Sequence, residues 1–304
     1  MNRSAPLAAL LVLAAAPLQA QARDREIRSR IDTTLTLSAG GAVELSLVSG
    51  EIVVTTGGAG RVQIRATSER GILDLDATPS RITLGVRNDR GRSRDTRYEV
   101  VVPQGTRVIA QTTSGDIGVR GTRAEVDLHS VSGSIQVADV AERATVESVS
   151  GDVTIRGAAG NVRAETVSGD LELYDVRGEL EAETVSGDLV LDGVASRWAR
   201  AETVSGEMSF AGPIEAGGRY DFAAHSGDVR LDLGGNAGIA FDVETFSGEI
   251  ESDFPITLNP GTTIEGRPRR FEFSVGGGGA RITVKTFSGD IQLGRGTGRG
   301  GQEN

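Results

Sequence analysis

The sequence predicts an all-β protein, a right-handed single-chain β-solenoid (parallel β-helix) whose coils are about 18–21 residues long. Three observations lead to this fold class. A Ser-Gly step occurs ten times in the 304 residues, and apolar and polar residues alternate on both sides of it. Glycine is abundant, with 42 residues, while aromatic residues make up only 4%. Many turns around a thin core are typical of a repeat protein rather than of a broad globular domain.

The first 22 residues have the pattern of a signal peptide. Arg3 precedes an apolar run from Leu7 to Ala16, which is too short to cross a bilayer, and Ala20-Gln21-Ala22 is a small-x-small cleavage site. Cleavage after Ala22 is expected, with cleavage after Ala20 or an uncleaved anchor as the alternatives. The mature chain is then expected to be exported, to the periplasm, the cell surface or the extracellular space, with no transmembrane segment.

Charge and cysteine content narrow the function classes. The formal net charge of −10 argues against a general nucleic-acid binder, which needs a basic footprint. The chain has no cysteine, so disulfides, thiol catalysis and zinc-thiolate sites are excluded.

Residues 23–105 are expected to form irregular N-terminal coils. Short runs of period-2 alternation, broken by Gly40-Gly41 and Gly57-Gly58, predict strands and turns. The segment from Arg87 to Arg97 carries five arginines. It is expected to be a solvated hairpin or loop, with a polyanion-binding patch as the alternative.

Residues 106–293 are expected to form the regular repeats. Nine Ser-Gly steps begin at 114, 132, 150, 168, 186, 205, 226, 247 and 288. The first four intervals are 18 residues, the next three are 19 to 21, and the last is 41, which predicts two further coils between Ser247 and Ser288. A period near 20 is too short for a propeller blade, and the Leu/Asn ladder of leucine-rich repeats is absent.

Aligning the 18-residue units places apolar residues in shared columns. Alternate residues of a strand face opposite sides, so these columns should point inward and the polar columns between them outward. Parallel crossovers are overwhelmingly right-handed, which gives the expected hand of the coil. The inward columns hold Val126, Ala144, Val162 and Leu180; Leu128, Val146, Ala164 and Ala182; Ile135, Val153, Leu171 and Leu189; Val137, Ile155, Leu173 and Leu191; Val140, Ala158, Val176 and Val194.

The Ser-Gly corner is expected to be structural. Its glycines, among them Gly169, are expected to occupy a positive-φ position that a Cβ disfavours, so replacing Gly169 by valine should destabilise the fold. The acidic residue that follows, such as Asp170, can accept hydrogen bonds from turn N–H groups.

After Val194 the coils lengthen and aromatic residues appear. Most of them are expected to fill a wider core, with a binding platform on Trp198 and Tyr220 as the alternative. The aromatic residues considered are Trp198, Phe210, Phe222, Phe241, Phe246 and Phe287. The final residues, 294–304, are expected to form a disordered tail.

Two stretches resemble the DUF4097 family, whose members are also called putative adhesins. The first is Val101-Val102-Pro103-Gln104-Gly105 followed by Thr112-Thr113-Ser114-Gly115-Asp116-Ile117, and the second runs from Gly276 to Ile291. The resemblance covers roughly residues 35–293. It implies a β-strand repeat domain with an adhesin-like role and supplies no catalytic motif.

The acidic residues of the corners form the first candidate site. Stacked carboxylates can coordinate Ca²⁺, and Asp152, Asp170 and Asp188 are the weak calcium candidates. The nonapeptide spacing of calcium-binding β-rolls is absent, so turn structure is the preferred interpretation and no cofactor is expected.

Two further candidate sites were weighed for catalysis. Glu147, Glu165 and Glu183, joined by Glu202, form an outward column with the carboxyl spacing of a retaining glycosidase, but repetition gives each the same environment. His129 and His225 each precede a serine in sequence, and adjacent residues face opposite sides of a strand, which argues against a nucleophile–base pair.

The sequence therefore favours a non-catalytic, exported, adhesin-like binding or structural module of the cell envelope or extracellular space. Its expected partner is a cell-envelope polymer, glycan or surface protein. The alternatives are a polysaccharide-active β-helix enzyme (glycosidase or lyase) and an envelope-stress signalling component.

Overall fold

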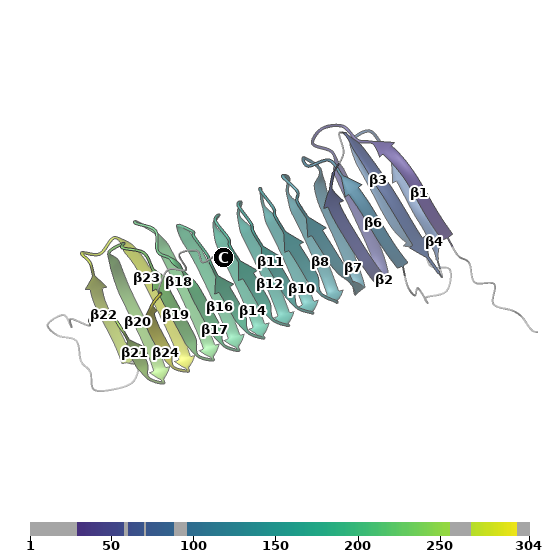
Figure 1. Cartoon of the computed structure of the whole chain (residues 1–304). Helices are drawn as coiled ribbons and strands as arrows, with labels where there is room; N and C mark the ends of the chain where they lie inside the picture. The colour runs from purple at the N-terminus through teal and green to yellow at the C-terminus, as the bar shows by residue number, and fades with distance from the viewer. Residues whose placement is uncertain (1–28, 58–59, 70, 88–95, 256–268, 297–304) are drawn as a thin grey trace, which may run out of the picture.

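The structure is a computed structural model and describes residues 29–57, 60–69, 71–87, 96–255 and 269–296. The predicted signal peptide lies outside these residues, as do residues 88–95 of the arginine-rich segment and residues 297–304 of the predicted tail. The described residues form 24 strands and no helix, stacked in one elongated pile (Figure 1). No described segment is a helix that could cross a membrane.

Each regular coil contains a longer strand that ends at the Ser-Gly corner and a shorter strand that follows the corner. The longer strands stack on one another and form the long-strand face, and the shorter ones form the short-strand face. The long-strand face contains β8 (Val126–Ser132), β10 (Ala144–Ser150), β12 (Val162–Ser168), β14 (Leu180–Ser186), β16 (Trp198–Ser205) and β18 (Arg219–Ser226). The short-strand face contains β9 (Ile135–Ala138), β11 (Val153–Arg156), β13 (Leu171–Tyr174), β15 (Leu189–Asp192), β17 (Met208–Pro213) and β19 (Val229–Gly234).

These strands pair in parallel with the register that the repeat predicts. Glu147 lies opposite Glu165, which lies opposite Glu183, so every equivalent position of the sequence repeat stacks on its counterpart. The third side of the coil is also bonded between coils, because Ala159 N–H donates to the Val140 carbonyl at 2.8 Å and Ala195 N–H to the Val176 carbonyl at 2.8 Å. The parallel β-solenoid is confirmed, and its right-handed sense stays a prediction.

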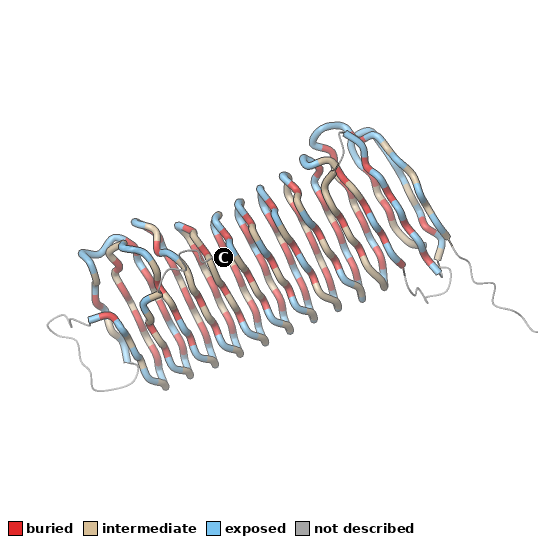
Figure 2. Tube along the Cα trace, in the orientation of Figure 1, coloured by how far each residue is buried: buried red, intermediate tan, exposed pale blue. Residues whose placement is uncertain are grey.

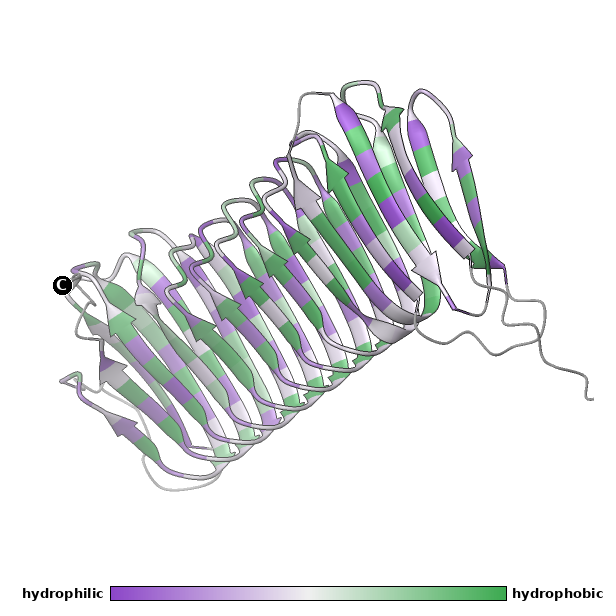
Figure 3. Ribbon diagram, turned by 45° about the vertical axis from the view of Figure 1, so that its right-hand side comes forward, coloured by the Kyte–Doolittle hydropathy of each residue, from purple (hydrophilic) through white to green (hydrophobic). Residues whose placement is uncertain are grey.

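The core is the narrow space enclosed by the coils. All five predicted apolar columns are buried, with no member more than 2% exposed. Figure 2 shows the consequence as buried and exposed residues alternating along each strand, and Figure 3 shows the same alternation in hydropathy. Each fully buried Val, Leu or Ile stabilises the fold by roughly 1.5–3 kcal/mol, so a thin core repeated over many coils is sufficient without disulfides.

The N-terminal end of the pile is closed by strands that do not follow the repeat. The long strands β2 (Ala42–Thr56) and β7 (Arg107–Arg120) pass through the corner without a break and pair in parallel. Antiparallel pairs β1–β3, β3–β6 and β4–β5 lie outside them. The bounds are β1 (Ser29–Thr36), β3 (Arg61–Ser68), β4 (Ile72–Ala77), β5 (Arg81–Arg87) and β6 (Thr96–Val102).

The C-terminal end corrects one prediction. The 41 residues between Ser247 and Ser288 do not add two coils in sequence. Instead the strand ending at Ser288 inserts between the strands ending at Ser226 and Ser247, giving the order β18–β23–β20–β22. The bounds are β20 (Ile239–Ser247), β21 (Ile250–Ser252), β22 (Arg269–Val275), β23 (Ala280–Ser288) and β24 (Ile291–Arg295).

The physical reason for this order lies in β22. It runs antiparallel to β20 and occupies the outer edge of the long-strand face, which leaves the next strand only the inner side of β20. A terminal strand that differs from the repeat hinders the addition of further strands to an open edge. β24 continues to Arg295, so pairing extends past the predicted end of the solenoid at residue 293.

Of the six late aromatic residues named above, three are buried in the core, Trp198 is half-buried and two are exposed, so the prediction that most of them fill the core is met only in part. Phe210, Phe222 and Phe241 are buried, whereas Phe246 is 41% and Phe287 50% exposed. The prediction for these two is wrong because each stands immediately before the corner serine, at an outward position of its strand.

Candidate binding groove

The corner aspartates are structural hydrogen-bond acceptors. The Oδ1 atom of Asp152 accepts the backbone N–H of Asp170 at 3.0 Å, and Oδ1 of Asp170 accepts the N–H of Asp188 at 2.9 Å. Asp188 in turn accepts the N–H of Glu207 at 2.9 Å. Each carboxylate thus bonds to the next coil along the pile, which supports the predicted role in turn structure.

The three weak calcium candidates, Asp152, Asp170 and Asp188, lie in this ladder with one oxygen of each already engaged. Among the described residues no group of three or more His, Asp or Glu side chains has the geometry of a metal site. The arrangement links adjacent coils through their backbones and offers no preformed cage.

The glutamate column lies on the outer side of the long-strand face. Glu147, Glu165, Glu183 and Glu202 are stacked in register on β10, β12, β14 and β16. Neighbouring strands are separated by about 4.8 Å, so these carboxylates form a closely spaced row of like charge.

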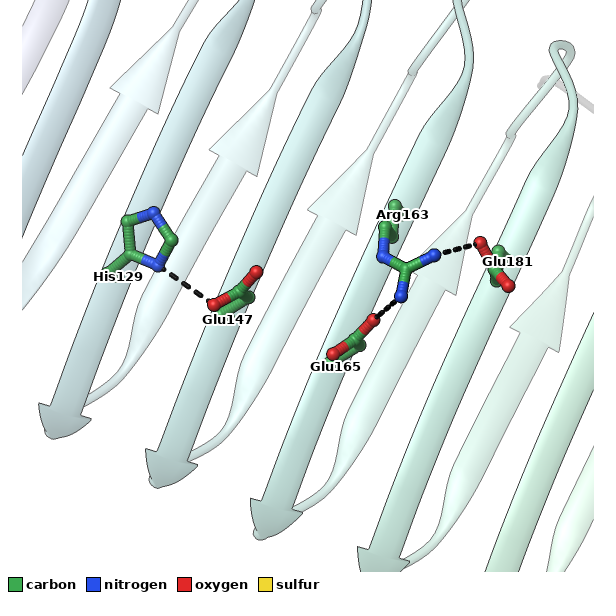
Figure 4. Close-up of polar contacts among 5 residues, drawn as sticks. All are labelled: His129, Glu147, Arg163, Glu165 and Glu181. Carbon is green, nitrogen blue, oxygen red and sulfur yellow. Dashed lines mark hydrogen bonds and ion pairs between the residues drawn. The ribbon is translucent and has the colours of Figure 1, made fainter.

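Neighbouring side chains contact part of this row, and those of Arg163 and Arg200 bring positive charge. His129 Nδ1 lies 3.1 Å from Oε2 of Glu147, and Arg163 forms ion pairs with Glu165 and Glu181 (Figure 4). Further along the pile, Nη2 of Arg200 lies 2.7 Å from Oε1 of Glu202. Such exposed pairs contribute about 0–1 kcal/mol each, so they fix side-chain positions more than they stabilise the fold.

Glu183 differs from the other members of the column. No hydrogen bond or ion pair joins it to another described residue. Burial raises the pKa of its carboxyl group, and the charges of Glu165, Glu202 and Glu181 raise it further, while Arg163 lowers it. The environments of the column are therefore less uniform than the repeat suggests.

The two histidine–serine pairs are not nucleophile–base pairs. Nε2 of His129 lies 2.8 Å from Asp127 on the outer surface, whereas Ser130 is buried with only 4% exposed. His225 stacks on the Phe287 ring, with centroids 5.1 Å apart, and does not contact the adjacent serine. The opposite facing that alternation predicts is observed for His129 and Ser130, whereas His225 and Ser226 are both exposed at the corner.

A row of exposed valines runs beside the glutamate column, and the sequence-based prediction missed it. Two residues after each glutamate on the same strand stands a valine that is 45–49% exposed. A signal for it was present, because residues two apart on a strand share a face, so the valine must point outward with the glutamate. The row consists of Val131, Val149, Val167, Val185 and Val204.

These two rows are the walls of a shallow groove of about 910 Å³. It extends over the strands β2, β7, β8, β10, β12, β14, β16 and β18. At about 4.8 Å per strand, the groove is roughly 34 Å long. Neither lysine nor arginine is among the described residues that line it.

The floor of the groove is the serine or threonine that stands between two outward-facing residues on each strand, with its side chain directed inward. These side chains are at most 6% exposed, and their hydroxyls make no hydrogen bond to another described group. A buried hydroxyl without a partner lowers stability, typically by 1–3 kcal/mol. The floor consists of Thr112, Ser130, Ser148, Thr166, Thr184 and Thr203.

The C-terminal continuation of the valine row is aromatic. His225, Phe287 and Phe246 stack with centroid separations of 5.1 and 4.9 Å and interplanar angles of 8° and 2°. Because each ring face covers the next ring, the stack presents mainly ring edges to solvent. By contrast, Tyr220 is fully buried and its hydroxyl donates to the Ser196 carbonyl at 2.5 Å, so the predicted alternative of a platform on Trp198 and Tyr220 is wrong.

The described ends of the arginine-rich segment are paired with acidic residues. Arg87 lies 2.7 Å from Asp74, and Arg97 lies 2.9 Å from both Glu51 and Glu99. These two guanidinium groups therefore form ion pairs with acidic residues of neighbouring strands and do not form a free basic patch.

Comparison of the chain with models of known protein families finds one family that it matches. The family model described as Toastrack DUF4097 matches residues 43–294. None of the curated proteins matches the chain.

The solved structures that resemble this chain share little sequence with it. A "putative lipid binding protein" from Parabacteroides distasonis ATCC 8503 has a TM-score of 0.51 and 9% identity, covering 87% of this chain and 97% of that one. A "putative adhesin" from the same organism has a TM-score of 0.50 and 7% identity, with coverage of 86% and 96%. A "putative adhesin" from Bacteroides fragilis NCTC 9343 has a TM-score of 0.47 and 10% identity, with coverage of 87% and 96%. At such identities the likeness to the two Parabacteroides distasonis structures shows the fold alone.

Proposed function

This chain belongs to the Toastrack DUF4097 family, and on that premise we propose that it is a non-catalytic, adhesin-like binding or structural module, exported to the cell envelope or the extracellular space. The observation that carries the proposal is the groove on the long-strand face. From β10 to β16 it repeats the same three side-chain types, a glutamate, a serine or threonine, and a valine, on each successive coil.

Repetition of this kind suits binding better than catalysis. Acid/base catalysis needs two groups whose environments push their pKa values apart and hold them around one reacting bond. A row of equivalent weak contacts instead lets a long partner engage several coils at once, and linked contacts raise the overall affinity without any strong single site. An elongated rigid pile with an open groove supplies such a row.

The proposed location outside the cytoplasm rests on the N-terminal segment and on composition. The apolar run and the Ala-x-Ala site have the form of a signal peptide, and a chain without cysteine needs no particular redox compartment. The excess of acidic residues disfavours nucleic acid as a partner. The proposed partner class is a cell-envelope polymer, glycan or surface protein.

The test is a binding screen of the purified mature chain, residues 23–304, against glycans, envelope polymers and surface polypeptides, with product release measured in the same samples. We expect retention of at least one polymer without turnover. Val167→Arg places a long cation in the groove and should weaken that binding. Val190→Arg makes the same change on the outer side of the short-strand face, where Val190 is half-buried, and should leave binding unchanged.

Two results contradict the proposal. Release of shortened polymer identifies an enzyme of the polysaccharide-active class. Absence of binding to every polymer in the screen removes the adhesin-like role.

A further inference from the structure

The groove has two walls of different chemistry on the same strands. On β12 the wall residues are Glu165 and Val167, and on β14 they are Glu183 and Val185. Residues two apart on a strand are separated by about 7 Å, so a carboxylate row and a methyl row run in parallel at that distance. Both rows continue without interruption from β10 to β16.

The carboxylate wall lacks sufficient positive charge. Four glutamates line the groove, while Arg163 and Arg200 approach them from the next outward position and do not line it. Glu183 forms no ion pair with a described residue and lies between two further carboxylates. A partner that brings cations to this wall therefore meets complementary charge.

The valine wall is an apolar surface that no described part of the chain covers. Its five valines keep almost half of their surface exposed, and the stacked rings extend the row at the C-terminal end. A continuous exposed apolar stripe bordered by charge is typical of an interaction surface. The partner should therefore bring apolar side chains to this wall.

An extended polypeptide has the geometry that these two walls require. Its side chains alternate between opposite sides every 3.3–3.4 Å, so a chain lying along the groove directs alternate residues to the glutamate wall and the others to the valine wall. The groove of roughly 34 Å can hold about ten extended residues, and its stretch with both walls, from β10 to β16 and roughly 14 Å long, holds about four or five of them. Lysine and arginine also place aliphatic stems along apolar surface while their charged heads reach the carboxylates.

Other occupants fit less well. A second copy docked groove to groove would bring two glutamate rows together, and such like-charge contact is unfavourable. A glycan would find few open aromatic faces along the groove, because the rings of His225, Phe287 and Phe246 stack on one another and the remaining wall residues from β10 to β16 are valine and glutamate.

We propose that the groove between the Glu147–Glu202 column and the Val131–Val204 row binds an extended polypeptide segment in which basic and apolar residues alternate. This inference rests on the proposed function of the chain as a binding module and specifies its partner as a protein segment.

The test compares two labelled octapeptides of identical composition by fluorescence anisotropy on the mature chain. One alternates Lys and Val, and the other repeats Lys-Lys-Val-Val, which directs half of its lysines to the wrong wall. We expect the alternating peptide to bind about five- to tenfold more tightly. Its affinity should rise with length up to about five residues and change little beyond that, and it should weaken as salt concentration increases.

Variants locate the binding. Glu165→Gln and Glu183→Gln should each weaken binding of the alternating peptide roughly two- to fivefold. Glu142→Gln removes the same charge from an exposed position between the two faces and should have no effect. Val167→Thr keeps the shape of the side chain, adds a hydroxyl to the apolar wall and should also weaken binding.

Equal affinity for the two octapeptides overturns the inference, since it indicates general attraction of cations to an acidic protein. Equal loss from Glu142→Gln and Glu183→Gln overturns it in the same way. An oligomer of glucosamine serves as a third probe. If it binds the groove while neither peptide does, the polypeptide partner is rejected and the proposed binding function stands.

Discussion

The glycines of the corner column are the positions at which the smallest substitution should have a large effect. A Cβ built on Gly169 lies 2.4 Å from the carbonyl oxygen of Gly151 in the preceding coil, and φ of Gly169 is +149°. Backbone atoms cannot rotate away from this contact, so in Gly169→Ala the two corners must move apart. The separation strains the hydrogen bond from Gly151 N–H to the Ser168 carbonyl and that from Asp170 N–H to the Asp152 carboxylate, both 3.0 Å long.

The expected loss follows from these contacts. One or two weakened hydrogen bonds cost about 1 kcal/mol each, and a non-glycine residue in a sparsely populated backbone region costs about 1–3 kcal/mol. We expect Gly169→Ala to lower the free energy of unfolding by about 2–4 kcal/mol. Gly169→Val should cost more because it adds two further methyl groups at the same place.

Substitutions at two other glycines serve as controls. They distinguish the effect of a steric contact with a neighbouring coil from the effect of a positive φ. Gly217 has φ of +74° with nothing within 4 Å of a built Cβ, so Gly217→Ala should cost only about 1 kcal/mol of strain. Gly105 has open space and no positive φ, and Gly105→Ala should change stability by less than about 1 kcal/mol. Urea unfolding followed by far-ultraviolet circular dichroism measures the free energy of unfolding of each of these glycine variants. If Gly169→Ala costs no more than Gly217→Ala, contact between adjacent corners is not what requires glycine.

Four further predictions concern other parts of the fold. Thr166→Val removes a buried hydroxyl without a partner at constant shape and should raise the free energy of unfolding by about 1 kcal/mol; a loss of stability would show that the hydroxyl is bonded. Tyr220→Phe leaves the Ser196 carbonyl and the Glu215 N–H without the phenol and should cost about 1–3 kcal/mol in the same assay, and an unchanged midpoint would contradict the buried hydrogen bonds. The pKa of Glu183 is raised in the folded chain, so its charge destabilises the fold above that pKa and the penalty disappears as pH falls to the ordinary value of 4.5. Glu183→Gln should therefore raise the melting temperature at pH 7 and leave it nearly unchanged at pH 4; an equal effect at both pH values would count against this origin. Removal of calcium with a chelator should leave the melting temperature unchanged, because the corner aspartates bond to backbone N–H groups, and a drop would restore the calcium interpretation of that column.

The repeat determined most of the fold without any structure. Equal spacing of the Ser-Gly steps fixes which residues stack, and the two-residue period of a strand fixes which of them face the core. Both are local properties of the chain, and for this reason the apolar columns, the corner and the row from Glu147 to Glu202 were predictable. The same two-residue period also predicts that Val167 points outward, because Val167 and Glu165 are two residues apart on one strand.

What the sequence left open depends on contacts between segments far apart along the chain. The length of the segment before Ser288 is compatible with two added coils, and equally with a strand that turns back beside β20. Only the antiparallel pairing of β22 with β20 directs β23 to the inner side of β20. Whether outward valines are covered is likewise decided by neighbouring segments, and the described ones leave them exposed. The raised pKa of Glu183 arises from its burial and then from the carboxylates stacked beside it, both of which depend on the neighbouring coils. The sequence by itself thus determined the coil and its two faces, and the tertiary structure decided the order of the terminal strands and the groove, because pairing partners and exposure are set by the whole pile and not by one repeat.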